Sequence, residues 1–190
     1  MIKEMTGIRG KVEIRKFTFP KGNDRILLAE RDELIAHRNK RMVRIFDREY
    51  LKQLVVNHNI VTNHGDALIA DLMAQTPAQT KVDNTSGVIG VGTGFTAEAK
   101  TVTALVTQTG SNEAMDATYP KLKGAFNATD DNVVQYRSTF EAGDLIATGI
   151  DEAALGNATY LLAYAEVTPV VNMTASDTLQ VDWELTLLGA

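Results

Sequence analysis

The three histidines of the chain are the first residues whose type could support catalysis or metal binding. His58 and His64 lie near Asp66 and Asp71, and His37 stands alone in a charged segment. A separation of six residues fits neither the HExxH nor the HxxxH spacing, which places two imidazoles on one face of a helix. We therefore interpret the histidines as polar residues near the start of a helix and predict no metal site.

A glycine-rich segment at residues 90–94, with the sequence GVGTG, resembles a phosphate-binding loop only in composition. It lacks the Lys-Ser/Thr pair of a P-loop and the GxGxxG spacing of a dinucleotide site. Glycines at the end of a strand are typical of a turn with positive φ. The segment therefore predicts a turn, and we expect no bound cofactor.

The residues that could act as nucleophiles or as general acids and bases form no recognisable set. The chain has no cysteine, and none of its serines stands in a GxSxG setting. Its adjacent carboxylates, Asp130–Asp131 and Asp151–Glu152, would point to opposite faces of a strand or cap a turn. We predict no catalytic residues and expect a protein that is not an enzyme.

The first 58 residues are predicted to form an N-terminal arm and a charged helix that make assembly contacts. Residues 9–19 alternate partly, with a one-residue slip, which is typical of an extended arm or edge strand with a bulge. Residues 31–56 have a narrow apolar stripe at helical spacings, interrupted near Asn39, which favours a helix at a surface or between subunits. We expect the contacts between chains, rather than the chain's own core, to hold the following residues: Val12, Ile14, Phe17, Phe19, Arg41, Arg44, Ile45 and Phe46.

Residues 59–190 are predicted to form a β-rich domain with one short amphipathic helix at about 63–75. Thr62 or Asn63 can cap this helix, Asp66 suits its first turn, and Pro77 ends it. Strands are indicated at residues 88–91, 133–140, 159–171 and 179–187, and the last alternates apolar and polar residues without a fault. The fold class we predict is mainly β with a helical or extended N-terminal segment, as an antiparallel β-sandwich or open barrel.

The charge distribution separates the chain into two parts. Residues 1–60 carry a net charge of +6 and residues 61–190 a net charge of −11, which together give −5. Opposite charges suit head-to-tail contact between copies, although a charged helix near the start explains the pattern equally well. The cations are interleaved with acidic residues and accompanied by few aromatics, which does not favour nucleic-acid binding. No apolar run approaches the roughly 20 residues of a membrane span, and the N-terminus has no apolar signal region.

Several phrases of the sequence, in order, resemble the small virion proteins of tailed bacteriophages. Residues 59–73, NIVTNHGDALIADLM, match a pattern N-x-V-x-N-x-G-x-x-x-I-A-x-L that precedes a strand and a GTG turn in those proteins. The later phrases are IGVGTG at 89–94, TALV at 103–106, YRSTF at 136–140, GIDEAALG at 149–156 and LQVDWEL at 179–185. Together they span residues 59–187, about two-thirds of the chain, whereas residues 1–56 have no counterpart.

The resemblance implies a structural component of a virion, assembled in the bacterial cytoplasm. The leading hypothesis is an accessory capsid protein, of the decoration, cement or minor capsid type, that contacts the major capsid protein and copies of itself, as in a trimer. A tail, baseplate or fibre-attachment component is the alternative within the virion. A ligand- or carbohydrate-binding β-sandwich is the alternative from another class.

Overall fold

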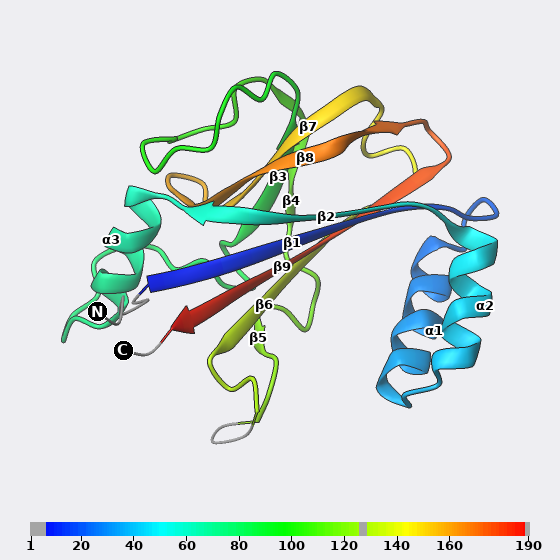
Figure 1. Ribbon diagram of the computed structural model, residues 1–190, viewed down its shortest axis with the longest axis horizontal. Helices are drawn as coiled ribbons and strands as arrows, with labels where there is room; N and C mark the ends of the chain where they lie inside the picture. Colours follow the sequence, from blue (N-terminus) through cyan, green and yellow to red (C-terminus); the bar gives the residue numbers. More distant parts are fainter. Residues whose placement is uncertain (1–6, 126–128, 189–190) are drawn as a thin grey trace, which may run out of the picture.

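The computed structural model describes residues 7–125 and 129–188 of the chain. These residues form one antiparallel sheet of nine strands, curled into a half-barrel (Figure 1). The predicted fold class, mainly β and antiparallel with an open barrel, is confirmed. In sheet order the strands are β4 (Gln108–Ala114), β3 (Val88–Gly92), β7 (Ala147–Gly156), β8 (Leu161–Met173), β2 (Leu51–Val61), β1 (Gly7–Thr18), β9 (Asp177–Leu188), β6 (Val133–Phe140) and β5 (Lys121–Leu122).

Strand β1 lies in the middle of the sheet, which corrects the prediction of an extended arm or edge strand. It pairs with β9 from Gly7 to Thr18 and with β2 from Gly10 to Phe17. The bulge predicted in β1 is not there: the register shift opposite Lys16 and Phe17 has its extra residue, Lys52, in β2, and β1 pairs with β9 without interruption. The expected boundary between residues 58 and 59 falls inside β2, so the described residues before and after it share one sheet.

Two helices, α1 (Asp24–Ala36) and α2 (Lys40–Tyr50), form a hairpin inserted between β1 and β2. The interruption expected near Asn39 is present, because the Asn39 side chain caps α2 by accepting a hydrogen bond from the backbone N–H of Met42 at 3.2 Å. The helix predicted to continue to residue 56 ends at Tyr50, because residues 51–59 pair with β1 as part of strand β2.

The third helix, α3 (Asn63–Leu72), confirms the predicted short helix and ends three residues earlier than expected. Its cap is Thr62, whose hydroxyl oxygen accepts a hydrogen bond from the backbone N–H of Gly65 at 3.0 Å. The helix lies against β8 across one edge of the half-barrel, at the end opposite the α1–α2 hairpin (Figure 1).

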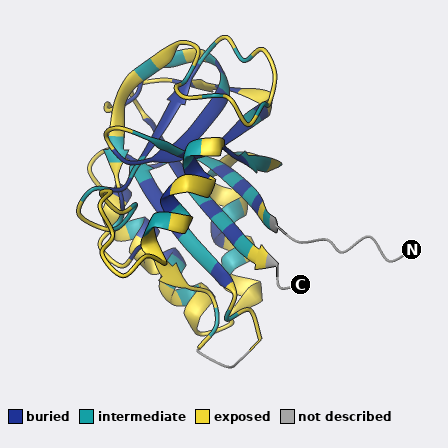
Figure 2. Ribbon diagram, turned by 90° about the vertical axis from the view of Figure 1, so that its left-hand side faces the viewer, coloured by how far each residue is buried: buried dark blue, intermediate teal, exposed yellow. Residues whose placement is uncertain are grey.

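The main core fills the inside of the curl, as Figure 2 shows by the buried faces of the strands. The alternation of β9 is confirmed, since Leu179, Val181, Trp183 and Leu185 are all buried in this core. Trp183 is completely buried and pairs with Val12 of β1 and Tyr136 of β6. The inner faces of β1, β6 and β9 therefore form one continuous apolar wall.

Replacing Gly65 by alanine is expected to lower the free energy of unfolding by about 2 kcal/mol, because overpacking a closed contact costs about 1–3 kcal/mol. A Cβ atom at this position would lie 2.1 Å from the backbone carbonyl oxygen of Leu162, so α3 would have to move away from β8. The matched control is Ala70→Gly on the exposed side of α3, which should cost about 1 kcal/mol through helix propensity alone. Urea unfolding measures both, and equal losses would contradict the close approach.

Candidate assembly surface on the helical hairpin

The α1–α2 hairpin is held at its base by an aromatic cluster. Its buried members are Phe17, Phe19, Leu28 and Phe46, and Tyr50 packs against them with its ring centroid 4.8 Å from that of Phe46. Phe17 lies two residues after Arg15, so both side chains are on the outer face of the sheet. The hairpin covers Phe17 on that face. The hairpin is therefore attached to the sheet through packed rings.

Five of the eight residues predicted to contact other chains are buried within this chain, which corrects the prediction for them. Val12 and Ile14 belong to the main core, and Phe17, Phe19 and Phe46 belong to the cluster under the hairpin. The reason is that β1 is a central strand with both faces covered near its end, which its partial alternation did not reveal.

The other three predicted contact residues, Arg41, Arg44 and Ile45, lie exposed on α2. They belong to a surface that we call the cationic face, made of four cations and two apolar side chains: Lys40, Arg41, Met42, Arg44, Ile45 and Arg48. Met42 is 43% exposed and Ile45 44% exposed. Within the part of the chain that the structure describes, none of these four cations has a carboxylate partner.

Polar contacts fix the orientation of the hairpin. The two helices are joined by Arg31 of α1 and Asp47 of α2, with 2.7 Å between Nε and Oδ1, and Arg31 is buried. At the start of α1 the buried carboxylate of Asp24 accepts hydrogen bonds from the Thr178 hydroxyl at 2.7 Å and the backbone N–H of Ala142 at 3.0 Å. The cationic face is therefore presented on a rigid element rather than on a loop.

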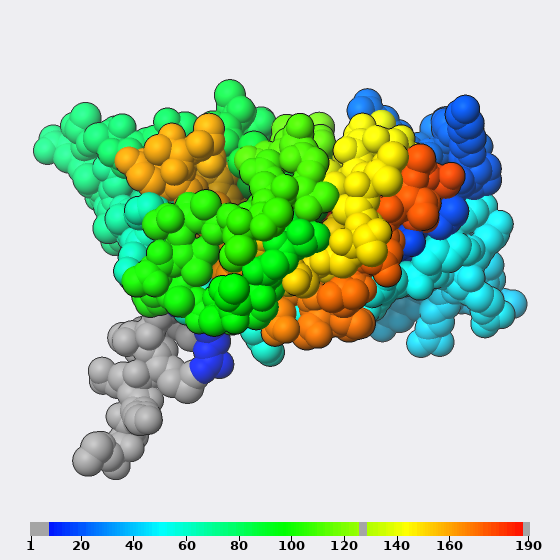
Figure 3. All heavy atoms as spheres, turned by 90° about the horizontal axis from the view of Figure 1, so that it is seen from above, coloured from blue at the N-terminus to red at the C-terminus, as the bar shows by residue number. Residues whose placement is uncertain are grey.

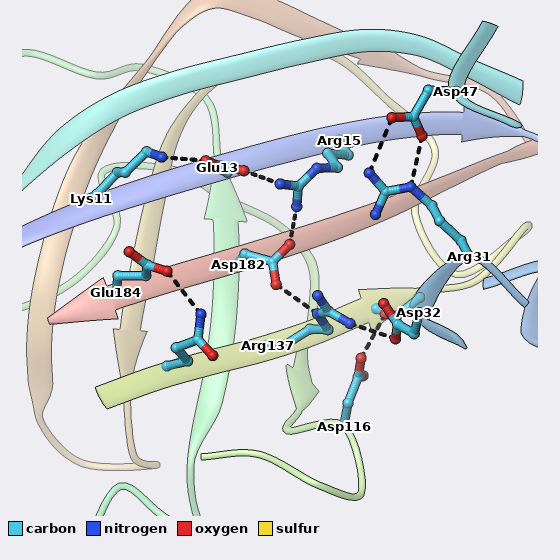
Figure 4. A network of polar contacts seen from close by, with 12 residues as sticks. Lys11, Glu13, Arg15, Arg31, Asp32, Asp47, Asp116, Arg137, Asp182 and Glu184 are labelled. Carbon is cyan, nitrogen blue, oxygen red and sulfur yellow. Dashed lines mark hydrogen bonds and ion pairs between the residues drawn. The ribbon is translucent and has the colours of Figure 1, made fainter. Parts of the chain in front are cut away.

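A network of ion pairs on the outer face of the sheet extends this attachment (Figure 4). Arg137 of β6 contacts Asp182 of β9 at 2.6 Å and Asp32 of α1 at 2.7 Å. Asp182 also pairs with Arg15 of β1, which pairs in turn with Glu13. Burial lowers the pKa of Arg137, but the charges of Asp182 and Asp32 outweigh it and raise that pKa. The hairpin and the three strands thus form one electrostatic unit.

Sequence reasoning did not single out the members of this network. The available signal was the alternation of β9, which places Asp182 and Glu184 on the face opposite Trp183. Arg137 is one of only five cations after residue 60, so it was a natural partner for them. The pairing of β6 with β9, which brings Arg137 beside Asp182, could not be predicted from the sequence.

Asp177 ties the end of β1, just before the hairpin, to the start of β9. Its carboxylate accepts hydrogen bonds from the hydroxyls of Thr18 at 2.6 Å and Thr174 at 2.7 Å, and it lies 2.9 Å from the Lys16 ammonium. Burial alone raises the pKa of Asp177, but these contacts outweigh it and lower the pKa to about 2.

Asp177→Asn is therefore expected to lower the free energy of unfolding at pH 7 by about 2 kcal/mol. A depressed pKa stabilises the fold above the pKa of the unfolded chain, and this stabilisation is lost as the pH falls from about 5 to about 2. In urea unfolding, the difference in free energy of unfolding between the Asp177→Asn variant and the unmodified chain should shrink over that pH range. Thr18→Val should remove part of the same stabilisation. A difference independent of pH would contradict the assignment.

The two histidines that could have formed a metal site lie on different elements. His64 lies in α3 with its ring edge against Tyr160, at a centroid distance of 5.1 Å, and His58 lies in β2. Among residues 7–125 and 129–188, no three His, Asp or Glu side chains are grouped to hold a metal ion. Nor does any helix in these ranges have the length and apolar character needed to cross a membrane.

At the α3 end of the half-barrel, the described residues line an apolar cavity of about 420 Å³. Its walls come from α3 and from the inner faces of β6, β8 and β9, and include Leu68, Leu72, Tyr136, Leu162 and Leu185. Seen from above, this end and the hairpin end mark the two extremes of the long axis (Figure 3).

Comparison of the chain with protein-family models, with curated proteins and with solved structures found no match.

Proposed function

We propose that this chain is a non-enzymatic structural protein of a tailed-bacteriophage particle, of the accessory capsid type. The observation that carries the proposal is the cationic face, where Met42 and Ile45 are exposed on a firmly attached hairpin, among four cations with no carboxylate partner among the described residues. Arginine and methionine are enriched at protein–protein interfaces, and arginine beside apolar side chains is a frequent centre of binding energy. The ordered phrases at residues 59–187 that resemble small virion proteins support the same reading.

In this proposal the half-barrel is the body and the hairpin is the contact element. The partners are the major capsid protein and further copies of this chain, and the site of action is the virion, assembled in the bacterial cytoplasm. A rigid contact element needs little ordering on binding, so less conformational entropy is lost than with a flexible arm.

The test is co-sedimentation of the purified chain with purified heads and, separately, with purified tails of the phage that encodes it. We expect saturable binding to heads and a loss of at least tenfold in affinity for Arg41→Glu with Arg44→Glu. The matched control reverses two exposed cations far from the hairpin, Lys81→Glu with Lys100→Glu, and should bind as the unmodified chain does. Absence of binding to both particles would overturn the proposal.

Within the virion, a tail or baseplate position is the alternative to a capsid position. The same experiment separates them, because binding to tails with no binding to heads would assign the chain to the tail. Opposite charges at different surfaces of one chain suit both the lattice of a head and the rings of a tail.

A ligand-binding β-domain is the second candidate, and the cavity beside α3 is the observation that favours it. The exposed surface of the lining is mostly apolar, so it suits an alkyl chain better than a carbohydrate. Calorimetric titration with a medium-chain fatty acid tests this candidate. Saturable binding that is lost in Leu72→Trp, which fills the mouth of the cavity, would support it, and no heat of binding would reject it.

A further inference from the structure

A second surface, on the other side of α1, has the opposite charge. We call it the acidic groove. It runs between α1 and the ends of β4 and β6, and its carboxylates are Asp32, Glu113, Asp116, Glu141 and Asp144. One cation, Arg25, lines it as well and pairs with Glu141. Asp32 is also paired with Arg137, so the remaining carboxylates give the groove a net negative charge.

The floor of the acidic groove contains an unused hydrogen-bond acceptor. Gln180 of β9 lines the groove and is only 2% exposed, and its carbonyl oxygen Oε1 has no donor among the described residues. Leaving such a buried acceptor unsatisfied costs free energy, and a cationic donor entering the groove would satisfy it. This observation is independent of the carboxylates and points to the same class of ligand.

Some carboxylates of the groove lie close enough to repel one another. Burial, followed by the charges of Asp144, Asp116 and Glu141, raises the pKa of Glu113. Burial likewise raises the pKa of Asp116, although the hydrogen bond from Thr139 and the charge of Arg137 oppose the rise. A positive group bound in the groove would relieve this repulsion.

The same chain carries a surface of opposite charge, the cationic face, but that face does not reach the chain's own acidic groove. The cationic face lies on α2, whereas α1 supplies one wall of the acidic groove. Figure 1 shows α1 between α2 and strand β6. No residue of α2 lines the groove, and Arg31 of α1 faces α2 instead. The two surfaces of one chain therefore cannot pair with each other, although those of two chains can.

We infer that the acidic groove of one copy receives the cationic face of α2 from a second copy. Arg41 and Arg44 would enter among the carboxylates, and Met42 and Ile45 would pack against the exposed alanines of the groove, Ala29, Ala114 and Ala117. The two surfaces are different, so the contact is heterologous, and repeated copies form a closed ring or an open chain. The inference deepens the proposed function, since it names one partner of the hairpin.

Charge reversal on each side tests the inference by sedimentation velocity at low ionic strength. The α2 variant is Arg41→Glu with Arg44→Glu, and the groove variant is Glu113→Lys with Asp144→Asn. We expect the unmodified chain to associate, and each variant to associate at least tenfold more weakly. The Asn keeps an oxygen for the hydrogen bond that Asp144 accepts from the backbone N–H of Glu141. Circular dichroism checks that each variant is folded.

A mixture of the two variants sharpens the test. An equimolar mixture pairs the unmodified α2 of the groove variant with the unmodified groove of the α2 variant, so it should associate again. Association of the α2 variant at unmodified strength would overturn the inference, because it would indicate a symmetric contact elsewhere. Loss of association in EDTA would also overturn it, because a metal ion would then occupy the groove.

Self-association and binding to phage particles are measured separately, so the inference and the proposed function can fail independently. A chain that stays monomeric at all concentrations but binds phage heads would overturn the inference and leave the proposed function standing. A chain that associates through these two surfaces but binds neither heads nor tails would do the reverse.

Discussion

A chain that begins at Asn59 is expected not to fold. The truncation removes β1 and most of β2, and β1 is the strand that joins β2 to β9 across the middle of the sheet. It also takes Val12 and Ile14 out of the main core and exposes the whole flank of β9, including Trp183. An unpaired central strand exposes its backbone groups and promotes aggregation. Circular dichroism and trypsin digestion of residues 59–190 should show an unfolded, rapidly cleaved chain.

The matched control keeps every strand and cuts only the connection within the hairpin. Arg38 is exposed between α1 and α2, so brief trypsin treatment of the full chain should cleave there. We expect the two pieces to remain together in gel filtration, because β1 stays paired with β9 and β2. A folded, protease-resistant fragment 59–190 would contradict the central position of β1 and restore the arm hypothesis.

Replacing Glu152 by alanine should lower the free energy of unfolding by about 3 kcal/mol. The side chain is fully buried, and its carboxylate accepts hydrogen bonds from the backbone N–H groups of Val106 and Thr107, both at 2.9 Å. It also accepts one from the Tyr164 hydroxyl at 2.6 Å. The alanine variant would leave three donors without an acceptor and release the loop between β3 and β4 from the sheet.

Guanidinium unfolding measures the stability, and proteolysis within residues 93–107 reports the release of the loop. Glu152→Gln is the matched control, because the glutamine amide oxygen still accepts hydrogen bonds and the size of the side chain is unchanged. The free energy of unfolding should therefore fall less than in the alanine variant. Equal stability of the alanine variant and the unmodified chain would show that the loop is held by other contacts.

The parts of the fold that the sequence predicted are those with a local signal. The α3 helix has its cap at Thr62 and its acidic first turn at Asp66, and β9 alternates so regularly that its buried face was evident. Both patterns are complete within about ten residues, and neither depends on which element lies beside it.

The N-terminal third was misjudged because its partners are distant in sequence. The outer-face residues of β1, such as Glu13 and Arg15, look like those of an exposed arm, but Asp182 of β9 pairs with Arg15. Val12 and Ile14 point to the inner face, whereas Phe17 points to the outer face after Arg15, and this change of face looks like a slip in the sequence. Phe17 and Phe19 are instead covered by a hairpin that returns over their own strand.

Only part of the candidate site could be read from the sequence. The exposed residues Arg41, Arg44 and Ile45 share one face of α2 at helical spacing, and this spacing can be recognised in the sequence. The acidic groove is assembled from α1, β4, β6 and β9, which are far apart along the chain, so its existence depends on the sheet order.

The claim that the cationic face is a contact surface in an assembled particle is tested most directly by arginine footprinting with phenylglyoxal. The free chain and the chain within purified particles are modified in parallel, and peptides are quantified by mass spectrometry. Buried Arg137 serves as an internal reference that should react slowly in both states. We predict that Arg41, Arg44 and Arg48 react in the free chain and are strongly protected in the particle. Equal reactivity of these three arginines in both states would contradict the account.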